Sequence, residues 1–186
     1  MIMLRSVAIA GLIITLLVGR VGLTAQDDPR LNDLFSELKS AGTVGGAAGI
    51  ELQIWHLWSL SNDSAVDRIL SGGTVAMNHG DFAAALNSFN RVIEMRPNFA
   101  EGWNKRATLY YLTGDYSRSI ADVKQTLALE PRHFGALSGL GLINMALERP
   151  GDALVAFEAA LAVHPQMPNA KRMVKRLRAL QEKSTI

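Results

Sequence analysis

Three prolines at a constant interval constrain the fold of this 186-residue chain more than any other feature. Pro97, Pro131 and Pro165 stand 34 residues apart, and the sequence repeats in step with them. A unit of this length is too small to bury its own apolar face, so neighbouring units must stack. The result is an elongated scaffold with a recessed surface, which favours binding of a protein or peptide over a single deep pocket.

The repeats align without a gap when they begin at Val66, Ala100 and Phe134. Two positions of each repeat are then small, and three are apolar and mostly large. Small residues let two antiparallel helices approach closely, and the larger ones fill the space between helix pairs. The small set is Gly73, Ala107 and Gly141 at the eighth position and Ala85, Ser119 and Ala153 at the twentieth; the larger set is Ile69, Trp103 and Leu137 at the fourth, Phe89, Val123 and Phe157 at the twenty-fourth, and Ile93, Leu127 and Leu161 at the twenty-eighth.

A turn signal lies in the middle of the repeats. Gly80-Asp81 and Gly114-Asp115 occupy the same slot, where glycine suits the end of one helix and aspartate can cap the next. The whole pattern resembles the tetratricopeptide repeat (TPR). The resemblance implies an all-α fold, a right-handed superhelical stack of antiparallel helix pairs, with three repeats within residues 63–166 at about 66–99, 100–133 and 134–167.

The chain departs from the TPR pattern at a few positions. Arg106 stands where the repeat usually has leucine, and Asn144 where it often has an aromatic residue. In the third repeat Glu148-Arg149-Pro150-Gly151 replaces the Gly-Asp turn. Proline is compatible with the first turn of the following helix, because its missing N–H is not needed there. We therefore expect a turn at this position in the third repeat too, formed by a different sequence.

Helices are also expected on both sides of the repeats. Residues 27–40 and 50–60 place apolar side chains on one helical face each, which predicts an N-terminal helical hairpin within 26–62. The glycine-rich residues 41–49 between them are either a loop or a weak helix start. Residues 169–182 present Met173, Leu177 and Leu180 on one side, which predicts a capping helix within 167–186.

The first 25 residues are of a different kind. Arg5 precedes the apolar residues 7–18, and the small residue Ala25 precedes a polar segment, as in a secretory signal peptide. The stretch is shorter than the roughly 20 apolar residues of a membrane span. We expect an exported, periplasmic bacterial protein with a signal peptide over residues 1–25; an uncleaved anchor in the inner membrane remains the alternative.

Charge gives no reason to expect a nucleic-acid partner. Removal of residues 1–25 would take away two arginines and no acid, leaving as many acidic as basic residues. One basic cluster remains in the C-terminal helix, and it is either a solvated face or a patch for acidic lipid headgroups or an acidic partner. Its members are Lys171, Arg172, Lys175, Arg176, Arg178 and Lys183.

We predict no enzyme, metal site or cofactor. The chain has no cysteine, and no two of its four histidines stand at metal-ligand spacing. His133 and His164 flank the repeat-ending prolines, which suggests surface turns. Gly135, Gly139 and Gly141 follow a predicted helix and not a strand, so they are better explained by the repeat than by a dinucleotide-binding loop.

The TPR resemblance implies where a ligand would bind. In that family the first helices of successive repeats line a concave face, and contacts usually come from the second, fifth, ninth, twelfth and thirteenth positions. These positions are Asp67, Leu70, Thr74, Met77 and Asn78 in the first repeat, Glu101, Asn104, Thr108, Tyr111 and Leu112 in the second, and Gly135, Ser138, Leu142, Met145 and Ala146 in the third.

This implied surface is mixed, with few charges, and suits an apolar peptide whose backbone could bond to amide side chains. Leu70, Leu112 and Leu142 could instead pack between helices. Leu70, Thr74 and Leu142 stand where some TPR proteins carry a Lys/Asn/Arg clamp for a C-terminal carboxylate, so we expect no such clamp.

Two functions are compatible with the sequence. The first is a non-catalytic scaffold of the cell envelope that binds a protein or peptide in the concave groove. The second is a structural or assembly factor that acts through the N-terminal hairpin or the basic C-terminal helix, with membrane contact possible through the N-terminal segment or that helix. Trp55 and Trp58 motivate the second reading, although tryptophans are more often core residues than ligand contacts.

Overall fold

The computed structural model describes residues 25–184, and within this range every regular element is a helix. The all-α fold class is therefore confirmed. The proposed signal peptide lies outside the described residues except for Ala25, which is buried against the first repeat. The elements are η1 (Ala25–Asp27), α1 (Arg30–Ser40), α2 (Val44–Trp58), α3 (Ser64–Asn78), α4 (Phe82–Met95), α5 (Ala100–Leu112), α6 (Tyr116–Leu129), α7 (Phe134–Ala146), α8 (Pro150–Val163) and α9 (Pro168–Ser184).

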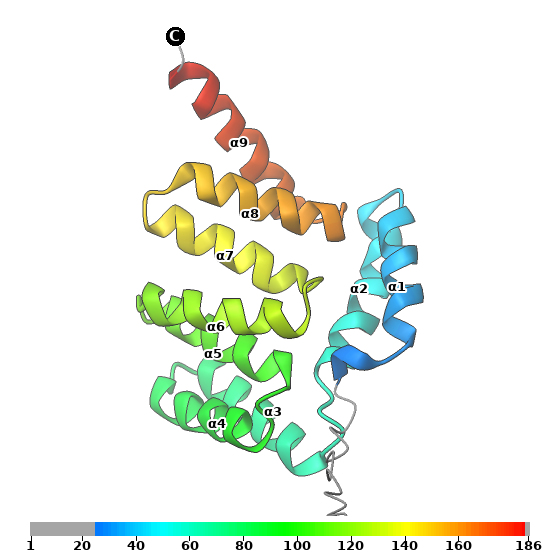
Figure 1. The fold of residues 1–186 in the computed structure, drawn as a ribbon, viewed down its shortest axis with the longest axis vertical. Helices are drawn as coiled ribbons and strands as arrows, with labels where there is room; N and C mark the ends of the chain where they lie inside the picture. Colours follow the sequence, from blue (N-terminus) through cyan, green and yellow to red (C-terminus); the bar gives the residue numbers. More distant parts are fainter. Residues whose placement is uncertain (1–24, 185–186) are drawn as a thin grey trace, which may run out of the picture.

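Three helix pairs stack on one another along the chain (Figure 1). Helices α3 and α4 form the first pair, α5 and α6 the second, and α7 and α8 the third. Helix α9 packs on α8 at the C-terminal end of the stack. Within residues 25–184 no helix is both long and apolar enough to span a lipid bilayer.

Close approach within each pair explains the small residues at the eighth repeat position. A Cβ added to Gly73 would lie 2.7 Å from the Cβ of Ser88, and one added to Gly141 would lie 2.7 Å from the ring of Phe157. In the second repeat Ala107 is accommodated, and its carbonyl accepts a hydrogen bond of 2.7 Å from Ser119 Oγ. The prediction that small side chains let the paired helices meet is thus confirmed.

The turns within the pairs need a left-handed residue, and two kinds of residue supply it. Gly80 and Gly114 adopt φ angles of 80° and 78°. In the third repeat Glu148 takes this role with a φ of 56°, a conformation that costs a non-glycine residue energy. Pro150 stands in the first turn of α8, as the sequence predicts.

Arg106 has a specific structural reason for replacing leucine. Its Nε and Nη2 donate to the two carboxylate oxygens of Asp122 at 2.7 and 2.9 Å, and its Nη1 donates to Asn90 at 2.8 Å. The guanidinium thereby joins α5 to the second helices of two repeats. A polar bridge stands here in place of an apolar contact.

The N-terminal hairpin precedes the repeats in sequence, yet it does not add a layer to the stack beyond α3. Helices α1 and α2 lie beside the stack, along the side where the repeats are joined (Figure 1). Their apolar side chains, with Trp58 at the centre, are buried against Phe134 and contact Val163 and Met167. In the glycine-rich segment 41–49, residues 44–49 form the start of α2, and Thr43 caps this helix by accepting a hydrogen bond of 3.1 Å from the N–H of Gly46.

The expectation that His133 and His164 lie in surface turns is wrong. Both imidazoles are buried, with 0% and 1% of their area exposed. Each lies in the turn after the second helix of a repeat, where the hairpin covers it, and Trp58 stacks on the His133 ring with centroids 4.1 Å apart. Turns of a repeat stack are normally solvent-exposed, and here the hairpin supplies the burial.

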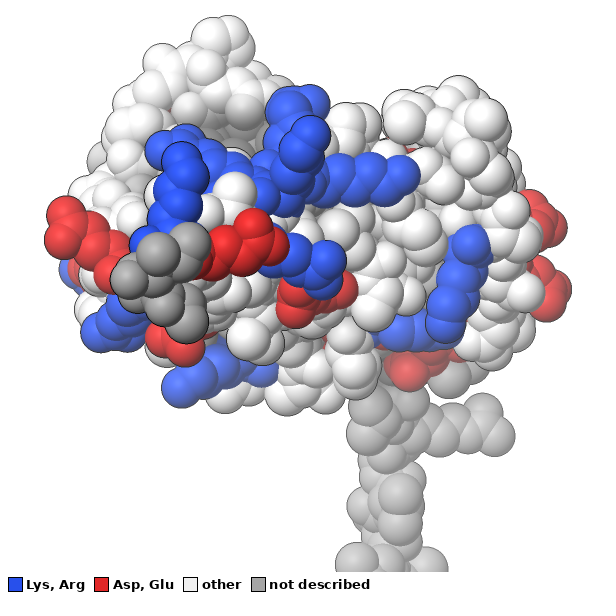
Figure 2. Space-filling model, turned by 90° about the horizontal axis from the view of Figure 1, so that it is seen from above, with Lys and Arg blue, Asp and Glu red and all other residues white. Residues whose placement is uncertain are grey.

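Helix α9 covers the apolar end of the stack. Ala170, Val174 and Leu177 are buried against α8, whereas Leu180 is 49% exposed because α9 runs on beyond α8 (Figure 1). Its basic residues face solvent, and Figure 2, which looks down on this end, shows Lys and Arg side chains gathered there.

Candidate peptide-binding groove

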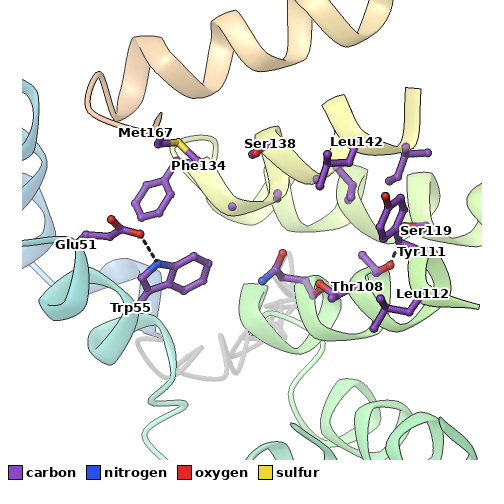
Figure 3. A pocket seen from close by; sticks show the side chains of 17 residues that line it. Glu51, Trp55, Thr108, Tyr111, Leu112, Ser119, Phe134, Ser138, Leu142 and Met167 are labelled. Atoms are coloured by element: carbon purple, nitrogen blue, oxygen red, sulfur yellow. Dashed lines mark hydrogen bonds between the residues drawn. The ribbon is translucent and has the colours of Figure 1, made fainter. Parts of the chain in front are cut away.

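A cavity of about 330 Å³ lies between the hairpin and the first helices of the second and third repeats. Figure 3 shows α2 on one side of it, α5 below and α7 above. Its walls therefore come from two parts of the chain that are far apart in sequence, residues 51–55 and residues 104–167. The lining residues are Glu51, Trp55, Asn104, Ala107, Thr108, Tyr111, Leu112, Ser119, Val123, Phe134, Gly135, Ala136, Ser138, Gly139, Leu142, Ile143 and Met167.

The cavity is mainly apolar and is exposed at one end. Leu112 and Leu142 are 52% and 41% exposed, so two large apolar side chains face water there. The other end is closed by Trp55, Phe134 and Met167 (Figure 3). An apolar cleft with a few polar groups has the character of a ligand-binding site.

Trp55 reaches this position because residue 135 is glycine. A Cβ at Gly135 would lie 2.5 Å from the Cη2 atom of Trp55, which is a clash. Gly135 is the second position of the third repeat, where the first two repeats carry Asp67 and Glu101. The indole thus occupies space in the groove that a side chain takes elsewhere in the stack.

Glu51 holds the Trp55 end in place. Its Oε1 accepts a hydrogen bond of 3.3 Å from the Trp55 indole N–H, and its Oε2 lies 3.2 Å from His164 Nε2. His164 Nδ1 accepts from the backbone N–H of Gln166 at 3.4 Å. These contacts fasten the hairpin to the turn after α8.

A second polar cluster supports the groove from below. The Oε2 atom of Glu101 lies 3.0 Å from His133 Nε2 and accepts from Asn104 Nδ2 at 2.9 Å, while Lys105 Nζ lies 3.2 Å from Oε1. Burial disfavours the charged carboxylate, but the hydrogen bond from His133 and the charge of Lys105 outweigh this, so the pKa of Glu101 lies below its ordinary value. His133 Nδ1 accepts from the N–H of Ala136 and caps α7.

The structure brings seven of the fifteen implied groove residues together around the cavity, six with side chains and Gly135. They come from the second and third repeats only, and the six are Asn104, Thr108, Tyr111, Leu112, Ser138 and Leu142. Of these, Asn104 is nearly buried, and its amide nitrogen already binds Glu101.

The other predicted residues lie outside the cavity. Asp67 accepts hydrogen bonds from the backbone N–H and hydroxyl of Ser61, and Thr74 donates to the carbonyl of Leu70. Glu101 belongs to the buried cluster described above. The rest are distributed as follows: Leu70 and Met77 are in the first repeat's core, Asn78 is exposed at the end of α3, Met145 packs beside the α8–α9 core, and Ala146 is exposed.

Sequence reasoning missed Glu51, Trp55, Phe134 and Met167 as lining residues. Glu51 and Trp55 stand four residues apart on α2, a spacing that places them on one helical face. This spacing shows that α2 has a face with a carboxylate and an indole, but it does not show against which part of the protein that face packs.

Comparison with known proteins gives the same fold. The Tetratricopeptide repeat family matches residues 70–125 and 105–168. The Sgt2 TPR domain of Aspergillus fumigatus superposes with a TM-score of 0.61 at 19% identity, over 66% of this chain and 83% of that one. The first TPR of Spaghetti (RPAP3), solved bound to the HSP90 peptide SRMEEVD, gives 0.61 at 18% identity, over 64% and 96%.

Two relatives show the range of sequence identity and coverage. Small glutamine-rich tetratricopeptide repeat-containing protein 2 of Saccharomyces cerevisiae is 27% identical over 104 residues, which are 56% of this chain and 30% of that protein. A TPR repeat-containing protein of Rhizobium etli is 34% identical over 148 residues, which are 80% of this chain and 72% of that protein. With these matches and the stacked helix pairs, the chain belongs to the tetratricopeptide repeat family.

Proposed function

We propose that this protein is a non-catalytic TPR scaffold that binds a segment of a partner protein in the groove between α2, α5 and α7. The observation that carries the proposal is the apolar cavity of about 330 Å³ with exposed Leu112 and Leu142 at its mouth. A structural neighbour, the first TPR of Spaghetti, was solved with a peptide bound, which supports the same use of the fold here.

Site-specific photo-crosslinking in cells tests whether the groove is the contact surface. A photoreactive amino acid at Thr108 or Ser138, both of which line the groove, should capture a defined segment of a partner, identified by mass spectrometry. The control position is Gln125, which is exposed on α6 and lies outside the groove. Equal capture from all three positions would contradict groove binding.

A pair of leucine substitutions then measures the contribution of the groove. The captured segment is synthesised and titrated against the protein by calorimetry. Leu142→Ala should weaken binding about five- to tenfold, because a half-exposed leucine buried on binding contributes on the order of 1 kcal/mol. Leu180→Ala is the matched control, since Leu180 is 49% exposed on α9 and outside the groove. Equal affinities of the two variants would count against the proposal.

We propose further that residues 1–25 direct export, so that the scaffold acts in the bacterial cell envelope. The support is the order of Arg5, the apolar residues 7–18 and Ala25. Cell fractionation followed by N-terminal sequencing should find a periplasmic protein that begins at Gln26. Full-length protein in the inner membrane would favour the anchor instead, and full-length protein in the cytoplasm would contradict both.

One observation favours a second candidate, an assembly role that uses α9. Its basic residues face solvent at the outer end of the stack, and Figure 2 shows Lys and Arg side chains gathered there with a few acidic side chains among them. Such a face attracts anionic lipid headgroups or an acidic protein. Lys175→Glu with Arg176→Glu should then abolish sedimentation with vesicles that contain anionic lipid, whereas the leucine variants above should sediment normally. Unchanged sedimentation of the charge-reversed variant would exclude lipid attraction by this face.

A further inference from the structure

The groove carries one formal charge, and it is negative. Among the 17 residues that line the cavity, all within the described range, Glu51 is the sole acid, and there is no lysine, arginine or histidine. The groove therefore offers an anchor for a cation and none for an anion. This composition separates it from a surface built to hold an acidic peptide.

The structure leaves the charge of Glu51 available. The nearest polar partner is His164, whose Nδ1 accepts a hydrogen bond from the backbone N–H of Gln166 at 3.4 Å, so we assign the ring proton to Nε2, which faces Glu51. One ring proton satisfies both contacts, and Glu51 Oε2 then accepts a single hydrogen bond from the ring. The Glu51 side chain is 39% exposed, and a carboxylate accepts about four hydrogen bonds, so a further donor can be accommodated.

Two cations on the segments that carry groove residues, one on α5 and one before α7, have other partners. Lys105 is held by Glu101, and Arg132 is held by Glu130 while it covers the ring of Phe35. The Trp55 indole beside Glu51 adds to the attraction, because an aromatic face favours a cation within about 6 Å. The closed end of the groove is thus suited to an ammonium or guanidinium group.

We infer that the groove selects a peptide segment in which an apolar residue is followed or preceded by lysine or arginine. The apolar side chain lies between Tyr111 and Leu142, and the basic side chain reaches Glu51 beside Trp55. The inference rests on the proposed function and specifies the chemistry of the bound segment.

A set of synthetic peptides tests the charge preference directly. Short capped Gly/Ser peptides with a central Leu-Phe pair carry lysine, glutamine or glutamate at each position on either side of the pair. NMR chemical-shift titration gives the affinity, and the Trp55 indole N–H reports binding at the closed end. We expect the best lysine peptide to bind about three- to fivefold more tightly than its glutamine counterpart, the upper range for a solvent-accessible ion pair. The glutamate counterpart should bind more weakly than both.

Substitution of the anchor assigns the preference to one residue. Glu51→Gln keeps a hydrogen-bond acceptor for the Trp55 indole but removes the charge, so lysine and glutamine peptides should bind equally well. Glu94→Gln, an exposed acid on α4 outside the groove, should leave the lysine preference intact. If circular dichroism shows that Glu51→Gln alters the fold, the salt dependence of the wild type provides the test. The affinity of the wild type for the lysine peptide should fall as salt is raised, whereas its affinity for the glutamine peptide should stay the same.

The outcomes separate this inference from the proposed function. If all three kinds of peptide bind equally and shift groove residues, the groove binds peptides and the charge preference is refuted. A lysine preference that survives in Glu51→Gln also refutes it. If no peptide shifts any groove residue, the inference and groove binding fall together.

Discussion

The close approach of α7 and α8 leads to a prediction that one substitution has different effects on stability at two glycines of the same helix. A Cβ at Gly141 would lie 2.7 to 2.8 Å from three ring atoms of Phe157, whereas a Cβ at Gly139 would meet nothing within 4 Å. Carbon atoms pack best at about 3.5–4.0 Å, so Gly141→Ala must displace the buried Phe157 ring by roughly 1 Å.

The two variants share every effect except this contact. Each gains helix propensity worth about 0.8–1 kcal/mol, and overpacking a core costs about 1–3 kcal/mol. Gly139→Ala should therefore be more stable than wild type by about 1 kcal/mol, and Gly141→Ala should be less stable than Gly139→Ala by about 1–3 kcal/mol. Urea unfolding followed by far-ultraviolet circular dichroism measures both. If Gly141→Ala proves as stable as Gly139→Ala, the close approach of the helix pair is refuted.

Three further predictions concern charged and strained positions. Arg106→Leu leaves the buried Asp122 carboxylate without its bidentate partner and should cost about 3 kcal/mol in urea unfolding, whereas a gain in stability would show that leucine suits this site after all. The pKa of Glu101 is lowered in the folded protein. Ionised Glu101 therefore stabilises the fold fully above its ordinary pKa of 4.5, and this stabilisation is lost as pH falls through the lower folded value. Glu101→Gln should therefore lose less stability than wild type between pH 7 and acid, and a parallel loss would refute the role of the Glu101–His133 pair. Glu148→Gly should stabilise the third repeat by about 1 kcal/mol, a rise in melting temperature of roughly 2–4 °C, because glycine adopts a positive φ freely; a lower melting temperature would contradict strain at this turn.

Much of the stack could be predicted because its contacts are local in sequence. A repeat touches mainly its neighbours, so a residue such as Gly73 or Phe89 has the same surroundings as its equivalent one period later. The spacing of small and large residues therefore predicts how α3–α8 pack against one another. The Glu148 turn shows the limit of this reasoning, since a residue other than glycine takes the left-handed conformation there.

The groove could be predicted only in part. The resemblance placed Thr108, Tyr111, Ser138 and Leu142 on one surface, and the structure has them around one cavity. Nothing in the repeat period shows that Trp55 closes that cavity, because its contacts with residues 133–135 join segments far apart in the chain.

By itself the sequence determined the helix pairs, their order and the terminal helix, since a 34-residue unit with one apolar face can be buried only against its neighbour. Only the tertiary structure decided where the hairpin lies. The amphipathic faces of α1 and α2 require burial but do not specify a surface, and it is the docking against the turns after α6 and α8 that buries His133 and His164 and closes the groove with Trp55.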